Sequence, residues 1–557
     1  MEQTNGYGVV YTPELLADFA ARLLFEELDR GNDACQTVID PACGEGALLR
    51  AFEKQCRAMN GVAEYRYAGV DIDSDVILKN RSEYYEKQTF VFECFDAIIP
   101  QNGSSSAKHW RSIFPQIDAI IANPPWSSDR IYSKEELQKA GYFFEHGQYD
   151  SYVLFVELCL QIVKKGGCCV FILPDSLFSG ENKELRKHLA ENTQICTIAR
   201  LGEKLFPGVN RASTILVVKK SKPTSNYETK CFRLTPDSRS HFLEGSIDIF
   251  NVFEHNYHLV RQRRFLENPA LSFDIDVTKQ EEGLLRKIEC DRVDWGRIFH
   301  FGRGVEVSKS GIVATCPHCH YASGFTKKQF AVHEKRCPFC GSTIKLEEKN
   351  IKRIIFNTPE KSFIPIFVGE NIRRYSESGK SYIIPGVAGV NYKTPKLYEP
   401  PKILIRKTGL GINAMIDYSS TYISQTVYSC NYLREQNSVP LEYYLGVLNS
   451  RLMYYYYLKM YGENEWKSHP YITKDIVFSL PIKRALAQNK KLCCRIARLA
   501  GQMQKNPARE TDLAIESLVW ELYNLTDEEK GIITEELRKL PNLGAINHMK
   551  IQDGEHV

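Results

Sequence analysis

Residues 38–49 read VIDPACGEGALL, and this stretch decides the expected fold. A β-branched run ends at Asp40, and a turn with Gly44 and Gly46 leads into a helical pattern of apolar residues. Glycines let a backbone come close to a ligand at the carboxyl end of a strand, where nucleotide-like molecules bind in α/β sheets. The spacing differs from GxGxxG, which disfavours a dinucleotide site. Glycine turns are also common in purely structural loops, so the stretch alone leaves that alternative open.

Two further acidic residues stand at the ends of later strand-like runs. Asp71 stands near the end of the apolar run at 67–72. Asp96, in ECFDAI, stands at another boundary between a strand and a loop. A carboxylate at the second strand end can accept hydrogen bonds from ribose hydroxyls. Strand-like runs alternating with helical patterns, such as the one at 13–28, predict a mostly parallel sheet covered by helices. Together the three strand ends predict a crevice that binds a nucleoside.

Residues 120–126 read IIANPPW and are the most informative stretch for chemistry. Two prolines fix φ and lack N–H donors, so the carbonyl of Pro124 is held in one direction. Asn123 offers a side-chain carbonyl beside it, and Trp126 offers a flat ring for stacking. Two acceptors that accept hydrogen bonds from both N–H groups of an NH₂ group turn its lone pair towards an electrophile. Such a reaction is accelerated mainly by positioning of the amine. An isolated NPPW is equally compatible with a plain turn, but the three preceding motifs favour the catalytic interpretation.

In this order, the motifs resemble those of the gamma-class DNA adenine-N6 methyltransferases of bacterial restriction–modification and phage-defence systems. The resemblance covers residues 7–220 and implies a Rossmann-like α/β methyltransferase domain that uses S-adenosylmethionine. Asp150-Ser151-Tyr152 follows in the family order downstream of the tetrapeptide. The resemblance implies that the cofactor is bound by Tyr11, Thr12, Pro13, Asp40, Ala42, Gly44, Asp71, Ile72, Asp96 and Asn123.

The same resemblance implies a base-flipping reaction, with catalytic residues Asn123, Pro124, Pro125, Trp126 and Phe206. The target adenine leaves the duplex at a cost of roughly a few kcal/mol and stacks between the two aromatic rings. Trp126 stands where the family more often has Tyr or Phe. Smaller enzymes that share the tetrapeptide methylate ribosomal RNA or a protein glutamine. They lack a large C-terminal domain, so adenine in double-stranded DNA is the better substrate here.

The composition and charge of the chain agree with two functional parts. Of 557 residues, 43% are hydrophobic and 25% charged, which excludes a disordered or collagen-like chain. Residues 1–220 contain 24 basic and 30 acidic residues, while the remainder carries a net charge of +10. We therefore expect a polyanion to be bound mainly by the second part. An ordinary solvated basic surface would give the same counts.

A cysteine cluster lies in the second part. Cys316, Cys319, Cys337 and Cys340 have the spacing C-x₂-C-x₁₇-C-x₂-C, which is typical of a zinc ribbon. Four thiolates close the coordination sphere, so the expected zinc is structural. Disulfides are the alternative, but seventeen cysteines spread over this length indicate reduced thiols.

The chain is expected to divide into three regions. These are a catalytic domain at 1–220, an α+β target-recognition domain at 227–482 with the zinc ribbon at 311–345, and a helical C-terminal region at 483–557. The polar, serine- and proline-containing stretch at 219–226 indicates a linker. Around the ribbon, looser matches resemble the family's recognition domain, and the candidate DNA contacts are Arg303, Arg373, Arg374, Arg406, Lys407 and Lys467. Each of these residues is also compatible with an ordinary surface charge.

The remaining expectations concern partners and location. The N-terminus lacks the apolar core of a signal peptide, and no apolar stretch is long enough to span a bilayer, so we expect a cytoplasmic bacterial or archaeal protein without a membrane. No nuclease motif is evident, so a restriction endonuclease or other defence subunit would be a separate chain. A catalytically inactive DNA-recognition subunit and a methyltransferase acting on RNA remain the alternative functions.

Overall fold

The computed structural model describes residues 12–28, 35–58, 64–99, 105–127, 132–144, 150–206, 211–307, 311–409, 411–433, 439–462 and 471–538. The chain forms two compact units, which are described separately. The first unit consists of Met1–Glu282 with Lys459–Lys467, and the second of Gly283–Leu458 with Ser468–Val557. The predicted boundaries at 220 and 483 stay predictions. No helix among the described residues is long and apolar enough to cross a bilayer.

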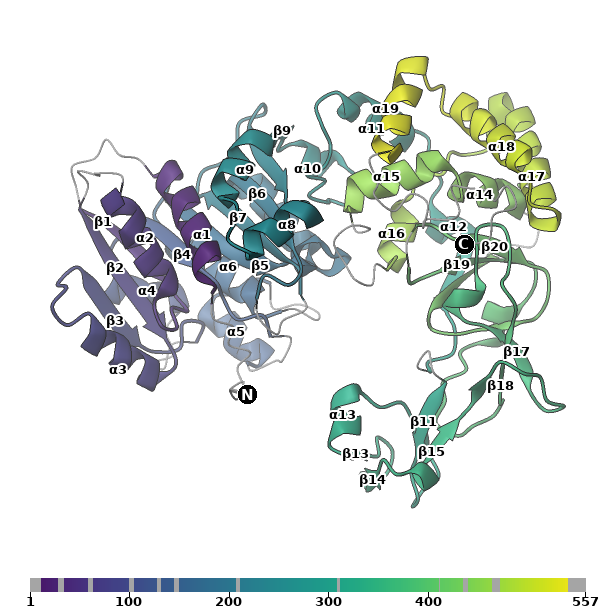
Figure 1. The fold of residues 1–557 in the computed structure, drawn as a ribbon, viewed down its shortest axis with the longest axis horizontal. Helices are drawn as coiled ribbons and strands as arrows, with labels where there is room; N and C mark the ends of the chain where they lie inside the picture. The colour runs from purple at the N-terminus through teal and green to yellow at the C-terminus, as the bar shows by residue number, and fades with distance from the viewer. Residues whose placement is uncertain are drawn as a thin grey trace. The chain divides into compact units, whose positions relative to one another are not determined.

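The first unit is built on a nine-stranded sheet with the order β3-β2-β1-β4-β5-β7-β6-β8-β9 (Figure 1). Its strands are β1 Gln36–Asp40, β2 Tyr65–Asp71, β3 Phe90–Cys94, β4 Ala119–Ala122, β5 Cys168–Pro174, β6 Gln194–Gly202, β7 Ser213–Lys219, β8 Glu228–Arg233 and β9 His258–Arg261. Five of the described pairings are parallel. Strand β7 runs antiparallel to both of its neighbours, and β9 to β8. The sheet is therefore mixed, and the α/β methyltransferase fold expected from the sequence is confirmed at this level.

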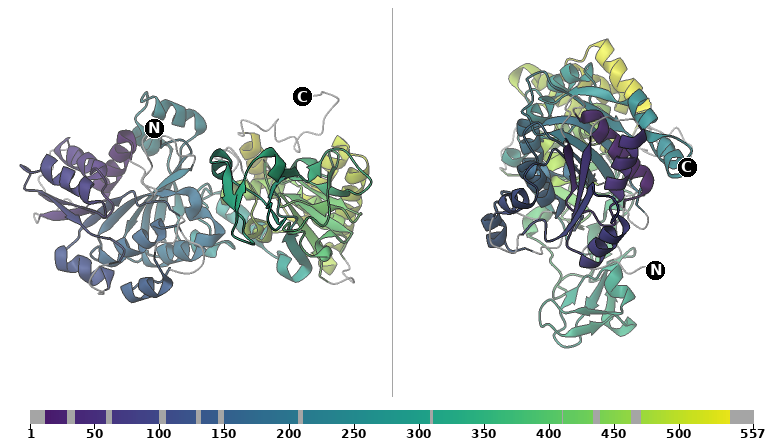
Figure 2. Two further views of the ribbon diagram at one scale, coloured as in Figure 1. Left: turned by 90° about the horizontal axis from the view of Figure 1, so that it is seen from below. Right: turned by 90° about the vertical axis from the view of Figure 1, so that its left-hand side faces the viewer.

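Helices cover both faces of this sheet, as two views of the ribbon show (Figure 2). They are α1 Glu14–Glu27, α2 Ala47–Ala58, α3 Ser74–Glu83, α4 Ser106–Ile113, α5 Lys134–Ala140, α6 Tyr152–Ile162, α7 Lys183–Asn192, α8 Pro236–Leu243, α9 Ile249–Asn256 and α10 Arg264–Glu267. Helix α1 buries Leu16, Phe19, Leu23 and Leu24 of the helical pattern predicted at 13–28, whereas Leu15 of the same pattern is exposed. Strands β4 and β5 are buried along their whole length, because helices cover both of their faces.

The second unit combines small sheets with a helical layer. An antiparallel sheet has the order β10-β22-β19-β20, and a mixed sheet, in which β17 and β21 run parallel, has the order β16-β18-β17-β21. The strands of these sheets are β10 Phe299–Arg303, β16 Ile355–Phe356, β17 Ile364–Phe367, β18 Ser381–Ile383, β19 Lys402–Arg406, β20 Ala414–Asp417, β21 Tyr422–Ile423 and β22 Val427–Tyr432. The cysteine region adds β11 Ile312–Thr315, β12 Ala322–Ser323, β13 Glu334–Arg336, β14 Thr343–Lys345 and β15 Ile351–Arg353.

The helical layer of this unit includes most of the predicted C-terminal region. Its helices are α11 Glu281–Glu289, α12 Trp295–Ile298, α14 Leu441–Leu448, α15 Arg451–Tyr461, α16 Lys474–Ser479, α17 Lys490–Lys505, α18 Arg509–Leu522 and α19 Asp527–Arg538, while α13 Lys327–Ala331 lies in the cysteine region. Helix α14 packs closely on α17, since a Cβ at Gly446 would lie 2.7 Å from the side chain of Ile496. The described part of the predicted C-terminal region, up to residue 538, is therefore mainly helical, and its helix α17 packs on α14.

Candidate functional site

A cavity of about 240 Å³ opens at the carboxyl ends of β1, β2 and β4. Its lining includes these predicted site residues: Thr12, Asp40, Ala42, Gly44, Asp71, Ile72, Asp96, Asn123, Pro124, Pro125 and Trp126. Pro13 instead stands at the N-cap of α1, and Tyr11 lies outside the described residues. Residues far apart in the sequence therefore meet in one cavity, as expected for strand ends of a parallel sheet segment.

Asp40 lies at the base of this cavity and is almost fully buried. Its carboxylate accepts a hydrogen bond from the backbone N–H of Ala42 at 3.1 Å. Burial raises the pKa of Asp40 to about 8, and the charge of Asp71 adds to the rise. No Lys, Arg or His of the described chain forms an ion pair with Asp40. A cationic group of a ligand would stabilise the ionised form.

Asp71 ties the end of β2 to the glycine loop. One carboxylate oxygen accepts from the N–H of Gly44 at 2.8 Å, and the other accepts from the N–H of Asp73 at 3.0 Å. The loop is also held by the buried side chain of Asn80, whose Nδ2 donates to the Gly44 carbonyl at 2.8 Å. Gly44 itself has a φ of +47°, a conformation that L side chains rarely adopt. These bonds preorganise the loop around the cavity.

Asp96 is oriented by its own backbone and by a residue that the sequence motifs did not identify. Its Oδ1 accepts from the N–H groups of Ile98 and Ile99 at 2.9 and 3.2 Å. The hydroxyl of Tyr132 lies 2.9 Å from both carboxylate oxygens and also lines the cavity. Tyr132 stands in a segment without a motif, so only the folded chain shows its role.

The tetrapeptide loop begins where β4 ends. The side-chain nitrogen of Asn123 donates to the hydroxyl of Thr12 at 3.0 Å, which sets the orientation of the amide. The hydroxyl of Ser151 donates to the Pro125 carbonyl at 2.5 Å and accepts from the Ser127 N–H at 3.1 Å. The loop is thus fixed at both of its ends, which is what precise positioning of a substrate amine requires.

Trp126 and Phe206 are brought together, but not as two faces of a slot. Their ring centroids lie 5.0 Å apart at an interplanar angle of 79°, and both side chains are buried. The indole N–H of Trp126 points to the carbonyl of Ile172 at 3.4 Å. Because the rings already touch edge to face, no base fits between them in this conformation. The predicted sandwich therefore needs correction: Phe206 has to move before a base can stack between the two rings.

Arg211 is the second residue at this site that the sequence did not indicate. Its guanidinium donates to the Trp126 carbonyl at 2.7 Å and to the carboxylate of Asp150 at 2.6 Å. The same group lies 6.0 Å from the centre of the Trp126 ring. Ser176 donates a further hydrogen bond to Asp150 at 2.8 Å. The fork of a guanidinium suits this arrangement, because it donates in two directions at once.

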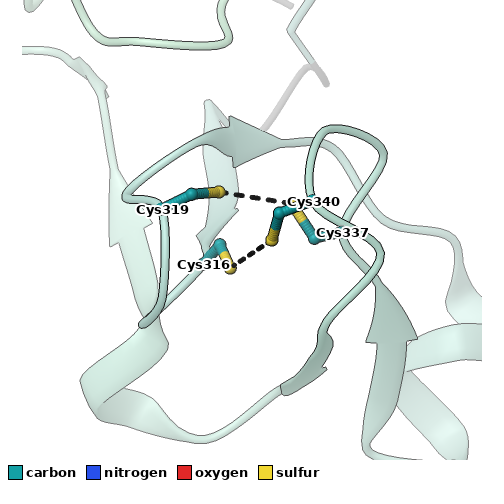
Figure 3. A group of neighbouring side chains, drawn as sticks. All are labelled: Cys316, Cys319, Cys337 and Cys340. Atoms are coloured by element: carbon teal, nitrogen blue, oxygen red, sulfur yellow. Dashed lines mark hydrogen bonds between the residues drawn. The ribbon is translucent and has the colours of Figure 1, made fainter.

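The four predicted cysteines converge in the second unit (Figure 3). Their sulfur atoms lie within 4.8 Å of one another, with 3.6 Å between Cys316 and Cys340 and between Cys319 and Cys337. A tetrahedron with Zn–S bonds of about 2.3 Å has edges of about 3.8 Å, whereas a disulfide requires about 2 Å. The donor set and its spacing therefore fit a closed tetrathiolate metal site.

Each pair of cysteines sits in the same kind of turn. The N–H of His320 bonds to the Cys316 carbonyl at 2.9 Å, and the N–H of Gly341 bonds to the Cys337 carbonyl at 3.1 Å. Both donors follow the second cysteine of their pair and have φ values of +59° and +75°. The two turns thus have matching backbone geometry, although they come from different parts of the chain.

Three of the predicted DNA contacts gather at one end of the β10-β22-β19-β20 sheet. Arg303 ends β10 opposite Tyr428, and Arg406 ends β19, where Ile405 pairs with the same tyrosine. The ammonium of Lys407 lies 5.9 Å from the Tyr428 ring. Burial lowers the pKa of Lys407, and the positive charge of Arg303 adds to this effect. Like charges this close repel one another, and an anion bound between them would offset the repulsion.

Arg373 belongs to the same group. Burial lowers the pKa of Arg406, and the charge of Arg373 is the next contribution, so these two side chains are also close. Arg373 itself is exposed. We define the cationic sheet end as Arg303, Arg373, Arg406 and Lys407.

The prediction for Arg374 is wrong. This side chain is buried, donates to the Asn449 carbonyl at 2.8 Å and forms ion pairs with Asp512 and Glu516 of α18. The two arginines lie in a tight turn in which the N–H of Arg373 bonds to the Ser376 carbonyl at 2.9 Å, and the turn exposes Arg373 while Arg374 enters the core. Lys467, the last of the predicted contacts, lies outside the described residues.

Comparison with known proteins assigns both parts of the chain. Residues 1–234 match the N-6 DNA Methylase family, and residues 364–482 match the TaqI-like C-terminal specificity domain. Residues 1–234 therefore form an N-6 DNA methylase domain. The cysteine turns at 316–340 lie between the two matched ranges, so neither family match accounts for them.

Relatives that match the first part of this chain include restriction–modification proteins. The chain is 28% identical over 212 residues to the type II methyltransferase M.BanIII of Aneurinibacillus aneurinilyticus, which covers 36% of each chain. It is also 28% identical over 237 residues to the type I MjaVII methylase subunit of Methanocaldococcus jannaschii, covering 39% of this chain and 37% of that subunit. The matched segments thus span little more than a third of these relatives. The structure of the type IIL enzyme MmeI in complex with DNA is similar in fold, with a TM-score of 0.52, 12% identity and coverage of 96% of this chain and 75% of that one.

Proposed function

We propose that the chain is a site-specific DNA methyltransferase that transfers a methyl group from S-adenosylmethionine to N6 of a flipped adenine in double-stranded DNA. The observation that carries this proposal is a single cavity lined by the acids of three strand ends and by the Asn123–Trp126 loop. We further propose that it modifies DNA in a restriction–modification or phage-defence system, with any restriction endonuclease or other defence subunit on a separate chain.

The residues of the cavity fit S-adenosylmethionine. Asp40 is a buried carboxyl suited to the cationic methionine end, Asp71 lies at the ribose position, and Asp96 with Tyr132 suits the adenine. Bound there, the cofactor would supply an electrophilic methyl group on a sulfonium. The protein's own contribution is to hold the loop and the acids in place.

The chain's residues would act on the target amine by positioning it. The carbonyl oxygens of Asn123 and Pro124 accept the two N6 hydrogens and stabilise the positive charge that develops on this nitrogen. Trp126 stacks on the base, while Ser151 and Arg211 hold the loop that carries these groups. Phe206 completes the slot after it moves away from Trp126.

The second unit would supply recognition. We propose that the cationic sheet end contacts DNA phosphates, because arginine and lysine side chains in such groups position a duplex. We also propose that the four cysteines hold a structural zinc ion, because four thiolates leave no open coordination position. We also propose that the chain divides into the catalytic, recognition and C-terminal helical regions that the sequence predicts.

The test is long-read sequencing of DNA from a host that expresses this chain. The expected result is N6-methyladenine at one sequence motif, absent from cells that carry the empty vector. Unmodified DNA with retained DNA binding would favour the alternative of an inactive recognition subunit. Methylated RNA with unmodified DNA would favour an RNA methyltransferase.

The buried carboxyl of Asp40 predicts a pH effect on stability. Its pKa is 3.8 ordinarily and about 8 in the folded protein, so the folded state retains a proton that the unfolded state loses between these values. The stabilisation is fully present below pH 3.8 and is lost as the pH rises through 8. Between pH 6 and 8 the loss is roughly 2 to 3 kcal/mol. Without cofactor, the unfolding midpoint of the wild type should therefore fall relative to that of Asp40→Asn between pH 6 and 8. A difference between the two midpoints that does not change with pH would contradict a raised pKa at Asp40.

Arg211 predicts a loss of turnover without a large loss of stability. Arg211→Ala removes the hydrogen bond to the Trp126 carbonyl and the ion pair with Asp150. We therefore expect kcat to fall by about tenfold or more, while KM for DNA changes less. The unfolding midpoint should change little, because the ion pair is partly exposed. Arg211→Lys, which can replace only one contact, should recover part of kcat. The matched control is Arg22→Ala, which breaks an exposed pair with Asp248. Equal losses of kcat in both alanine variants would disprove a positioning role.

A further inference from the structure

The first cysteine turn is attached to a loop of the recognition unit. The N–H of Ala322, in β12, donates to the carbonyl of Ala388 at 2.8 Å. Gly389 has a φ of +92°, and a Cβ there would lie 2.3 Å from the Ala322 carbonyl oxygen. The loop around Gly389 thus fits against the turn only because this residue is glycine.

The same loop continues to a residue that orients Arg303. Asn391 forms two hydrogen bonds with Glu306, both at 3.2 Å. Its side-chain Nδ2 donates to the Glu306 carboxylate, and its backbone carbonyl accepts from the Glu306 N–H. Lys393 donates to the Glu306 carboxylate at 2.6 Å, and Arg303 donates to it at 2.9 Å. These hydrogen bonds, that from Lys393 above all, hold the pKa of Glu306 below its ordinary value. Glu306 is therefore an anion that fixes the guanidinium of Arg303.

On the other side, the turn depends on the cysteine cluster. The N–H of Cys316 bonds to the carbonyl of Tyr321 at 3.0 Å, directly before Ala322. The buried core of this region consists of Ala314, Cys316, Cys337, Ile344 and Leu346. Five buried residues, two of them cysteines, are too few to fold such a module without a metal. Ala322 itself belongs to the neighbouring core with Val305 and Ile354, so the tetrathiolate site acts on it through the turn that ends at Tyr321.

We infer that metal binding at Cys316, Cys319, Cys337 and Cys340 controls DNA affinity by fixing Arg303 through Ala322, the 386–393 loop and Glu306. This inference rests on the proposed contact between the cationic sheet end and DNA. Loss of the metal loosens the turn before Ala322, the 386–393 loop then rests on a less rigid partner, and Arg303 loses its fixed orientation. Cofactor binding in the first unit does not depend on this chain of contacts.

The decisive variant separates the loop from the turn and leaves the metal ligands unchanged. Gly389→Ala should retain one zinc ion per chain by elemental analysis and wild-type affinity for S-adenosylmethionine by calorimetry. Its affinity for a fluorescein-labelled DNA duplex should fall about tenfold, because one oriented phosphate contact is lost. The matched control is Gly386→Ala in the same loop, where φ is +69° but no atom lies near an added Cβ. It should behave like the wild type in all three measurements.

A double-mutant cycle tests the route through Arg303. If the route is correct, Arg303→Ala with Gly389→Ala binds DNA no more weakly than Arg303→Ala alone. Zinc removal with a chelator should lower DNA affinity in the wild type and have little effect in the Arg303→Ala variant. Wild-type DNA affinity in Gly389→Ala, or additive losses in the double variant, would overturn the inference. If Arg303→Ala alone binds DNA normally, the proposed DNA contact fails as well, which distinguishes the two failures.

Discussion

Replacing Asn123 by alanine is expected to abolish methyl transfer, with kcat reduced by about a thousandfold or more. The variant loses one of the two acceptors for the substrate amine, and the Pro124 carbonyl alone leaves the amine free to rotate. It also loses the hydrogen bond to Thr12 that orients the loop against α1. The measurement is incorporation of tritiated methyl groups from S-adenosylmethionine into DNA under single-turnover conditions.

Cofactor binding by this variant should persist, because Asp40, Asp71 and Asp96 and their backbone partners are unchanged. Thr12→Val is the graded control, since it removes one hydrogen-bond partner of the Asn123 amide and keeps the amide itself. We expect it to lower kcat by much less than Asn123→Ala does. Wild-type turnover in Asn123→Ala would show that the tetrapeptide is not the catalytic loop.

The cavity could be predicted from the sequence because its residues lie at strand ends. Asp40, Asp71 and Asn123 each follow a short apolar run, and the carboxyl ends of adjacent parallel strands meet at one edge of a sheet. The four cysteines could be predicted for a similar reason, because two short turns fix the sulfur positions within each pair. Local geometry and one rule of topology were sufficient in both cases.

The remaining features depend on tertiary contacts that no local pattern specifies. Arg211 and Tyr132 reach the site from segments without a motif, and their roles follow from partners 85 and 36 residues away in the sequence. Arg374 looks like its exposed neighbour Arg373 in the sequence, but it pairs with Asp512 in α18, 138 residues later. The contact between Phe206 and Trp126 likewise depends on how two loops pack. A sequence pattern identifies which residues are chemically capable, whereas the fold decides which of them meet.

Replacing Asp274 by alanine is expected to destabilise the first unit by about 3 to 5 kcal/mol. The Asp274 carboxylate accepts from Nε of Arg264 at 2.7 Å and from Nδ2 of Asn268 at 3.2 Å, and both charged side chains are completely buried. Removing the carboxylate takes away a fully buried counter-charge of the guanidinium. Thermal unfolding should report the loss in the transition that S-adenosylmethionine shifts, because a ligand stabilises the unit to which it binds.

Two further variants separate a lost charge pair from a lost hydrogen bond. Glu93→Ala breaks an exposed pair with Arg81 in the same unit, so its cost should not exceed about 1 kcal/mol. Replacing both partners with apolar residues, as Arg264→Met with Asp274→Leu, removes the uncompensated charge and should recover most of the loss. Arg264 also donates to the sulfur of Met460, in the Lys459–Lys467 segment that belongs to the first unit. The alternative outcome is that the double replacement stays as unstable as Asp274→Ala. In that case the contacts of Arg264 to the Lys459–Lys467 segment contribute more than the charge pair does, and the pair mainly holds this segment in place.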